Sequence, residues 1–180
     1  RHSYPHSWRS KAPLIYRNTP QWFISMEKKN LRKIALKSID ETIFYPSQSK
    51  TRLRSMIETR PDWCISRQRV WGGPLPLFVN KKTGQPIRDI KLIDRIANIY
   101  EKEGSDTWFT EDPKRFLEND YSIDEYEQLK DIVEVWFDSG STHAFCLEKR
   151  TDLKWPASMY LEGSDQHRGW FHSSLLESSG

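Results

Sequence analysis

The predicted fold is decided by two stretches, Asp131-Ile-Val-Glu-Val-Trp-Phe-Asp-Ser-Gly140 and Ser158-Met-Tyr-Leu-Glu-Gly-Ser-Asp165. Each begins with an apolar run and leads into a glycine-containing turn, so residues 132–137 and 158–162 are expected to be strands. A helix from about residue 165 to 178 should follow the second strand. A strand, a glycine turn and a helix N-terminus form the unit in which α/β proteins bind ligands at the carboxyl ends of strands. We therefore expect the chemistry of this chain near its end.

The pattern upstream of these stretches is mainly helical and basic. Apolar residues recur at three- and four-residue spacing between Leu31 and Ile39, which predicts an amphipathic helix over residues 26–41. A second helix is expected over residues 49–58. Residues 14–16 and 21–24 are candidate short strands.

The middle of the chain combines a predicted hairpin with a helix. Residues 75–80 and 85–88 should pair across a turn in which Gly84 adopts a positive φ angle. A helix from about residue 90 should then end near Gly104. Residues 107–130 are acidic and lack a clear period, so we expect a solvated insertion with local helical turns at most.

Charge is distributed unevenly along the chain. The formal net charge of the 180 residues is +3. Residues 1–70, however, hold 15 lysines and arginines against 5 acidic residues, whereas residues 71–180 hold 13 against 20. Such asymmetry is typical of a polyanion-facing segment joined to an acidic one. A solvated basic helix explains the charge equally well.

The composition excludes several classes of protein. Aromatic residues make up 13% of the chain and charged residues 29%, which is typical of a folded domain rather than of a disordered one. No apolar run approaches the roughly 20 residues of a membrane span. Cys64 and Cys146 have no second cysteine at a metal-binding spacing, so neither a disulfide framework nor a zinc site is expected. A reducing, cytoplasmic setting fits best.

Polar residues follow the second predicted strand. Asp165 and Gln166 would lie in the first helical turn, where they could bind sugar hydroxyls or an amine. Gly163 would let a ligand approach the backbone closely. Helix capping by Ser164 or Asp165 explains the same residues without a ligand.

Two tryptophans and two arginines can each be interpreted as binding residues or as structural residues. Trp136 and Trp170 fit an apolar pocket at adjacent strand ends, or ordinary core packing. Arg67 and Arg69 lie in a tryptophan-flanked segment and are suited to stacking on bases and pairing with phosphates. They are equally suited to an internal clamp that ties a loop to a neighbouring domain.

Several motifs occur together and in a characteristic order. They are His2-Ser-Tyr-Pro-His6, Thr19-Pro-Gln-Trp-Phe23, Trp63-Cys-Ile-Ser-Arg-Gln-Arg-Val-Trp-Gly72, Val135-Trp-Phe-Asp-Ser-Gly140 and Tyr160-Leu-Glu-Gly-Ser-Asp-Gln-His-Arg-Gly-Trp-Phe171. With them the chain resembles the isoleucyl-tRNA synthetases, a family of class I synthetases, over all but about residues 81–130. The Ser-Arg-Gln-Arg element is shared with the leucine and valine enzymes. The last motif is characteristic of the isoleucine enzymes.

This resemblance implies an α/β fold, namely part of a Rossmann-type catalytic domain with small α+β connective insertions. Residues 1–24 would return from the editing insertion into the catalytic domain. Residues 25–72 would form a basic helical connective region, and residues 73–130 an acidic insertion of hairpin and helix. Residues 131–180 would begin the second Rossmann half.

The resemblance also implies a reaction, partners and site residues. The family activates isoleucine with ATP, with Mg²⁺ as metal cofactor, and transfers it to the 3′ end of tRNA(Ile); a monomer is expected. Carried over residue by residue, Trp136 and Trp170 match the isoleucine pocket. The positions that match the adenylate site are Glu162, Gly163, Asp165 and Gln166. Arg67 and Arg69 are the candidates for facing tRNA.

The sequence departs from the family pattern in ways that limit what this chain is expected to do. The His-Ile-Gly-His and Lys-Met-Ser-Lys-Ser signatures and the editing pocket are absent from the 180 residues. We therefore expect no catalytic or metal-ligating residue and no activity of the chain alone. Gly73 replaces a valine-like residue and Ser7 a common cysteine. The alternatives are a stand-alone RNA-binding module and a fragment of a valine or leucine enzyme.

Overall fold

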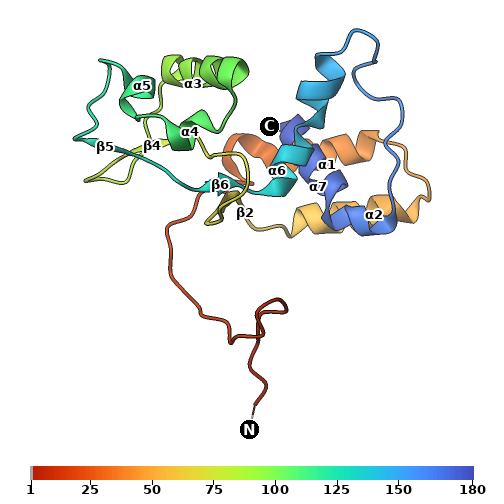
Figure 1. Ribbon diagram of the computed structural model, residues 1–180. Coiled ribbons are helices and arrows are strands. Elements are labelled where there is room, and N and C mark those ends of the chain that lie inside the picture. Colours follow the sequence, from red (N-terminus) through yellow and green to blue (C-terminus); the bar gives the residue numbers. More distant parts are fainter. Residues whose placement is uncertain (1) are drawn as a thin grey trace.

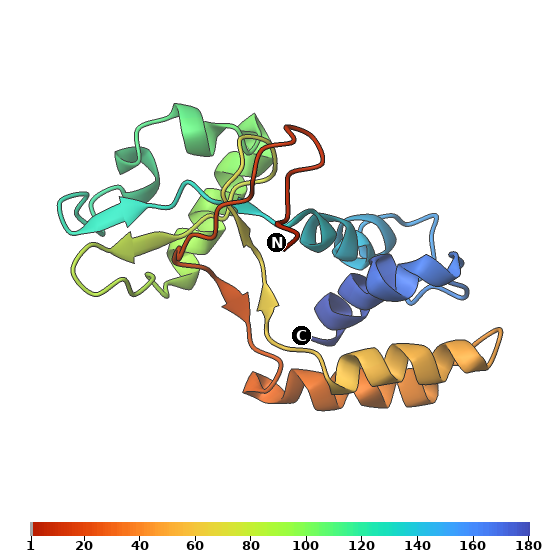
Figure 2. The same cartoon turned by 90° about the horizontal axis from the view of Figure 1, so that it is seen from below.

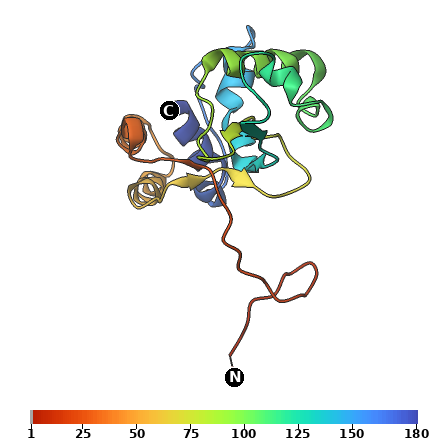
Figure 3. The same ribbon diagram turned by 90° about the vertical axis from the view of Figure 1, so that its left-hand side faces the viewer.

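Two helical clusters, joined by short antiparallel strands, make up the chain in the computed structural model, which describes residues 2–180 (Figure 1). One cluster contains helices α1, α2, α6 and α7, and the other contains α3, α4 and α5 beside strands β4 and β5. The first 20 or so residues extend away from both clusters as an arm (Figure 3). The arm contains an isolated bridge between His6 and Pro13, and the strand expected at residues 14–16 is not formed.

The first cluster is built around an antiparallel helix pair. Helices α1 (Leu31–Glu41) and α2 (Gln48–Glu58) lie side by side, and α7 (Trp170–Ser179) packs on them (Figure 2). Both predicted helices are confirmed. The start of the first is later than expected because Lys28–Asn30 form a separate 3₁₀ turn, η1, in which Lys29 and Asn30 have positive φ angles.

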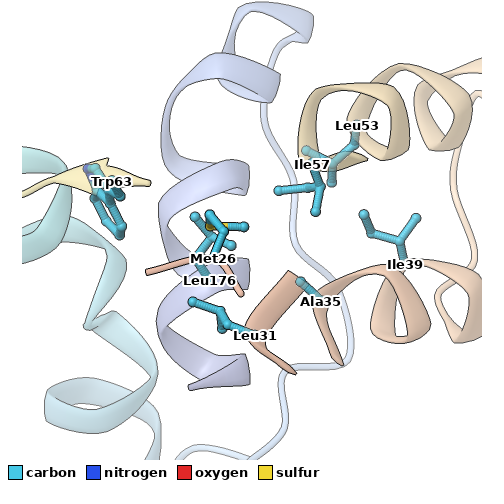
Figure 4. Close-up of a cluster of buried hydrophobic side chains, with 8 residues drawn as sticks. All are labelled: Met26, Leu31, Ala35, Ile39, Leu53, Ile57, Trp63 and Leu176. Atoms are coloured by element: carbon cyan, nitrogen blue, oxygen red, sulfur yellow. The ribbon is translucent and has the colours of Figure 1, made fainter. Parts of the chain in front are cut away.

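The buried side chains of this cluster come from segments far apart in the sequence (Figure 4). They are Met26, Leu31, Ala35, Ile39, Leu53, Ile57, Trp63 and Leu176. Strand β1 (Phe23–Ile24) pairs with β2 (Trp63–Cys64), which fixes the entry to α1 and the exit from α2. Leu176 closes the core from α7, so the end of the chain is held against its basic first half.

The second cluster corrects part of the prediction for residues 107–130. Helices α3 (Ile90–Glu103), α4 (Thr107–Thr110) and α5 (Lys114–Leu117) surround a core in which Trp108, Phe116 and Leu117 are fully buried. The expected helical turns are present as α4 and α5, but the segment is not wholly solvated, because these three side chains belong to a core. Its apolar residues are too widely spaced to give a periodic signal, because two one-turn helices present them. Helix α3 ends at Gly104, as predicted.

The predicted hairpin forms only as a short turn. Gly84 has a φ of 67°, and the amide of Ile87 donates to the carbonyl of Phe78 at 2.9 Å. The longer ladder joins β4 (Phe78–Asn80) to β5 (Tyr126–Gln128) instead of to residues 85–88. Pro86 has no amide hydrogen to donate, which limits that side of the hairpin to an isolated bridge with Val79.

The prediction of a strand over residues 132–137 is correct for the first two residues and wrong for the rest. Strand β6 (Ile132–Val133) pairs with β3 (Ser66–Arg67), and Val135–Gly140 form helix α6. Glu134 is the residue at which the chain turns into this helix, and its carbonyl accepts the amide of Phe137 at 2.8 Å. Helix α6 packs against α7, so residues 135–137 do not extend the sheet.

The second expected strand, residues 158–162, is also wrong. These residues are exposed and follow the π-helical turn η2 (His143–Glu148) and a loop. A strand needs a neighbour for its backbone groups, and within residues 2–180 none lies beside them. The described residues contain only two-stranded antiparallel sheets, so the expected Rossmann sheet is not present in them.

The helix predicted for residues 165–178 is confirmed in two pieces. Ser164–Arg168 form a 3₁₀ turn, η3, and α7 begins at Trp170, with Gly169 between them. None of the described helices is both long enough and apolar enough to cross a membrane.

Candidate functional site

Trp136 and Trp170 meet at the junction of α6 and α7. A Cβ atom built on Gly169 would lie 2.9 Å from the Cη2 atom of Trp136, so that ring packs on the Gly169 backbone. The indole nitrogen of Trp170, the next residue, donates to the carbonyl of Ser139 in α6 at 2.8 Å. A side chain at position 169 would have to displace the Gln166 carboxamide, whose Oε1 lies closest to the Cβ position, and the Trp136 ring.

The two indoles differ in how they are covered. The ring of Trp170 stacks on Tyr160 at 4.1 Å between centroids and 26° between planes. Burial raises the pKa of the Tyr160 phenol. Trp136 remains 39% exposed. The junction therefore presents one indole that is locked by stacking and one that is open to a ligand.

The predicted adenylate residues lie immediately before this junction. Glu162, Gly163 and Asp165 are exposed, and a Cβ atom on Gly163 would lie 2.8 Å from the Asp165 carboxylate. Gln166 donates from Nε2 to Asp165 Oδ2 at 2.9 Å, and its Oε1 accepts the Trp170 amide at 2.9 Å. The cap of α7 is thus Gln166, whereas Ser164 and Asp165 make no capping hydrogen bond.

A cavity of about 300 Å³ opens on the other side of Trp136. Its lining comes from the segment after α2, from β2 and β3, from the start of α6 and from the start of α7: Arg60, Pro61, Asp62, Trp63, Cys64, Arg67, Glu134, Trp136, Arg168, Gly169, His172 and Ser173. Glu134 is buried in this wall and accepts a hydrogen bond from Trp63 Nε1 at 3.2 Å. Its carboxylate thereby links β2 to α6.

The two arginines of the Ser-Arg-Gln-Arg element have different surroundings. Arg67 donates to the carbonyls of Cys64 at 2.9 Å and Ser66 at 2.8 Å, and lies 4.0 Å from Glu134. Arg69 is exposed. The internal-clamp interpretation therefore describes the contacts of Arg67, and Arg69 is the more accessible cation. A tRNA-facing role for either residue stays a prediction.

Burial shifts the ionisation of two groups on α7. The pKa of His172 is lowered to about 4, first because the ring is buried and then because Arg60 lies nearby. The pKa of Glu177 is raised to about 8, again chiefly by burial and then by the Asp138 and Glu134 carboxylates. At neutral pH His172 is neutral and Glu177 is largely protonated, so the wall between α6 and α7 carries less charge than its residue types suggest.

Sequence comparison agrees with this arrangement of motifs. Residues 8–179 match the family described as tRNA synthetases class I (I, L, M and V). The chain belongs to this class I tRNA synthetase family. Its relatives show which member it resembles in sequence. It is 69% identical over 179 residues to an isoleucine–tRNA ligase of Pelagibacter ubique (strain HTCC1062), covering 99% of this chain and 20% of that protein.

More distant relatives give the same result. The chain is 57% identical over 185 residues to the isoleucine–tRNA ligase of Brucella abortus (strain 2308), and 55% identical over 186 residues to that of Caulobacter vibrioides. These matches cover 100% and 99% of this chain, but 19% of each relative. This synthetase chain therefore spans about a fifth of the length of the curated relatives it matches.

Three residues of the synthetase cavity were not anticipated from the sequence. Glu134 could have been noticed, because it is a lone carboxylate in the apolar run Ile132–Phe137. Arg60 and His172 gave no signal, since a single arginine before a proline and a single helical histidine are ordinary surface residues. They meet only because the turn η3, which leads into α7, packs against α2.

Between residues 2 and 180 the structure contains no group of three or more histidine, cysteine or acidic side chains arranged to hold a metal ion. Magnesium in nucleotide-using enzymes often relies on one or two carboxylates together with substrate phosphates. The described residues thus do not form a protein-built Mg²⁺ site.

Proposed function

We propose that this chain is a segment of an isoleucine–tRNA ligase and supplies part of the isoleucine pocket and of the adenylate site. The observation that carries the proposal is the α6–α7 junction, where the Trp136 ring lies against Gly169, the residue before Trp170, and the exposed residues Glu162–Asp165 come shortly before both. The 69% identity to an isoleucine–tRNA ligase favours isoleucine over the valine and leucine alternatives.

The indoles suit the branched side chain of isoleucine. Trp136 offers an open aromatic face, and Trp170 is held in place by Tyr160 and by the carbonyl of Ser139. An apolar pocket rejects an amino acid that is shorter by one methylene only weakly, and isoleucine against valine in these enzymes is the usual illustration of that limit. We expect these two residues to give coarse selection only.

The residues before the junction fit the sugar and backbone portions of an adenylate. Glu162 and Asp165 offer exposed carboxylates as acceptors for hydroxyl or ammonium donors, and Gly163 leaves its backbone open to close approach. ATP supplies the α-phosphate that the isoleucine carboxylate attacks. The reaction needs positioning rather than a protein nucleophile, so this chain's part is to orient the amino acid and the ribose.

The amino-acid pocket is tested by segment exchange. The corresponding segment of the Pelagibacter ligase is replaced by this chain, and isoleucine-dependent ATP–pyrophosphate exchange is measured. Trp136→Ala and Trp170→Ala should each raise the KM for isoleucine by about tenfold or more, because apolar contact with the side chain is lost, and leave the KM for ATP nearly unchanged. Trp8→Ala, in the exposed N-terminal arm, is the matched control. An unchanged isoleucine KM in both site variants would contradict the assignment.

Two further parts of the proposal have their own measurements. The isolated chain should show no pyrophosphate exchange, and robust turnover would refute its inactivity. Charge reversal at exposed Arg69 should weaken tRNA binding by the exchanged ligase, and the same reversal at Arg67 would also disturb the fold through its carbonyl contacts. Competition among isoleucyl-, valyl- and leucyl-adenylate analogues separates the isoleucine ligase from the valine and leucine alternatives.

A further inference from the structure

The two indoles of the α6–α7 junction are held in place differently. Trp170 has its own anchors, because its indole nitrogen donates to the Ser139 carbonyl at 2.8 Å and its ring stacks on Tyr160. The Trp136 ring lies against Gly169 and is 39% exposed. Its position follows from where the backbone of α6 begins. The residues that fasten the first turn of α6 therefore decide where this ring lies.

Trp63 fastens that turn on both sides of Trp136. Its Nε1 donates to Oε2 of Glu134, two residues before Trp136, at 3.2 Å. Its ring packs on Phe137, the residue after Trp136, with 6.0 Å between centroids and 46° between planes. Trp63 is buried and belongs to the core of the first cluster. The start of α6 is thereby tied to that core.

Glu134 is held by both its backbone and its side chain. Its amide donates to the Ile65 carbonyl at 2.8 Å, and its own carbonyl accepts the Phe137 amide at 2.8 Å, which starts α6. The residue is buried, and its Oε1 lies 4.0 Å from Nη2 of Arg67. Burial lowers the pKa of Arg60, and the Glu134 carboxylate acts against that shift, so it also serves Arg60 as a counter-charge. Both carboxylate oxygens thus have partners.

These contacts join two of the sequence motifs at a cost that the fold does not require. Trp63 and Arg67 belong to the basic element of residues 63–72, and Glu134 immediately precedes the element of residues 135–140. Strands β3 and β6 already join the two elements through their backbones. A buried carboxylate loses its solvation, and an apolar side chain often replaces one without loss of stability. What the carboxylate adds is a directed hydrogen bond that fixes α6 in one place.

We propose that Glu134, held by Trp63, is a positioning residue that fixes Trp136 in the isoleucine pocket. The inference rests on the proposed function and gives the basic element a part in it, since Arg67 faces Glu134. A binding group keeps its place when hydrogen bonds behind it lock its supports. Loss of the Glu134 contact would let the first turn of α6 shift and carry Trp136 with it. Residues 162–165, which precede α7, would stay in place.

Glu134→Gln in the exchanged ligase tests the inference by isoleucine-dependent ATP–pyrophosphate exchange. The variant keeps the size of the side chain and removes its charge. The KM for isoleucine should rise about three- to tenfold, because a shifted ring keeps part of the contact that Trp136→Ala removes. The kcat and the KM for ATP should stay within about twofold. Glu103→Gln is the matched control, because it removes a carboxylate that pairs with Arg115 in the other cluster.

Trp63→Phe tests the same link from its other end. It removes the indole donor and keeps an aromatic ring in the core, so it remains informative if Glu134→Gln does not fold. The expected result is again a higher KM for isoleucine with an unchanged KM for ATP.

A double-mutant cycle separates positioning from a general loosening of the fold. In the Trp136→Ala background the ring that Glu134 positions is absent, so Glu134→Gln should raise the isoleucine KM by no more than about twofold further. An equal rise in both backgrounds would overturn the inference. So would an isoleucine KM that Trp136→Ala raises but Glu134→Gln and Trp63→Phe leave unchanged. An isoleucine KM unchanged in both Trp136→Ala and Trp170→Ala is a different outcome, which refutes the proposed function and this inference with it.

Discussion

Glu177 should make the stability of the chain fall as the pH rises. Its carboxyl lies on α7 against α6, and its Oε1 is buried without a hydrogen-bond partner. Burial and the nearby carboxylates of Asp138 and Glu134 raise its pKa from 4.5 to about 8. The position near the C-terminal end of α7 also disfavours a negative charge, because the helix dipole is negative there.

The sign follows from proton binding in the two states. Between pH 4.5 and about 8 the folded state holds a proton on Glu177 that the unfolded state has released, so stability is lost as the pH rises through this window. The raised pKa corresponds to an upper bound of about 5 kcal/mol. Because the side chain is only half-buried, solvent screening reduces the expected effect to ~1–3 kcal/mol.

Glu177→Gln removes this titration while keeping the size of the side chain. Urea unfolding of the chain, followed by tryptophan fluorescence, should give equal stability of the variant and the parent near pH 5, and a variant more stable by ~1–3 kcal/mol at pH 8.5. The lowered pKa of His172 stabilises the folded state above pH 6.5, and this contribution is lost as the pH falls toward 4. It is the same in both chains, so it does not affect the difference between them. Glu101→Gln, at an exposed site on α3, is the control. Identical pH dependence in the parent and Glu177→Gln would refute the reasoning.

Three other substitutions test packing, each by urea unfolding. Trp108→Ala should cost ~3–5 kcal/mol, since a fully buried indole is lost; a loss under about 1 kcal/mol would mean that residues 107–130 are not core. Gly169→Ala should cost ~1–3 kcal/mol, because the added Cβ would overlap Gln166 Oε1, and wild-type stability would contradict that crowding. Gly73→Ala should be neutral or stabilise by ~0.4–1 kcal/mol, because its Cβ would make only an ordinary 3.4 Å contact with Asp138; destabilisation would show a strained turn.

Helices of the first cluster were predictable because their signal is local. The apolar spacing from Leu31 to Ile39 places one face of α1 in the core, and Gln48–Glu58 differs by one residue from the expected second helix. Gly104 ended α3 as its position suggested. A helix is predicted from its apolar period and its terminating residue, and both are found within about a dozen neighbouring residues.

Strands were not predictable in the same way, because a strand depends on a distant partner. Val135, Trp136 and Phe137 have strand-forming side chains, yet they form the first turn of α6, the helix that packs against α7. Residues 158–162 are Ser-Met-Tyr-Leu-Glu, and their aromatic residue, Tyr160, stacks its ring on Trp170 instead of joining a sheet. β-Propensity reflects how well a side chain fits a half-buried, pleated sheet surface, and neither segment lies on such a surface in this chain.

The candidate site was predictable only in part. Trp136 and Trp170, 34 positions apart in the sequence, were placed in one pocket by resemblance to the synthetases, whereas their chemistry alone left core packing equally open. Arg60 and His172 are separated by more than a hundred positions, and only the packing of η3, which leads into α7, against α2 brings them to one wall. No periodicity or spacing rule connects residues at that separation.

Gln166 illustrates how the geometry refines a role that residue type leaves ambiguous. Its Oε1 accepts the Trp170 amide and its Nε2 donates to Asp165, so both ends of the amide are occupied within the chain. A ligand would have to break one of these bonds to use Gln166 directly. The free acceptors are the exposed carboxylates of Glu162 and Asp165. We therefore expect those two groups to contact a bound ribose or amine, and Gln166 to hold Asp165 and the start of α7 in position, so that the indole of Trp170 and the carboxylate of Asp165 are oriented by one side chain.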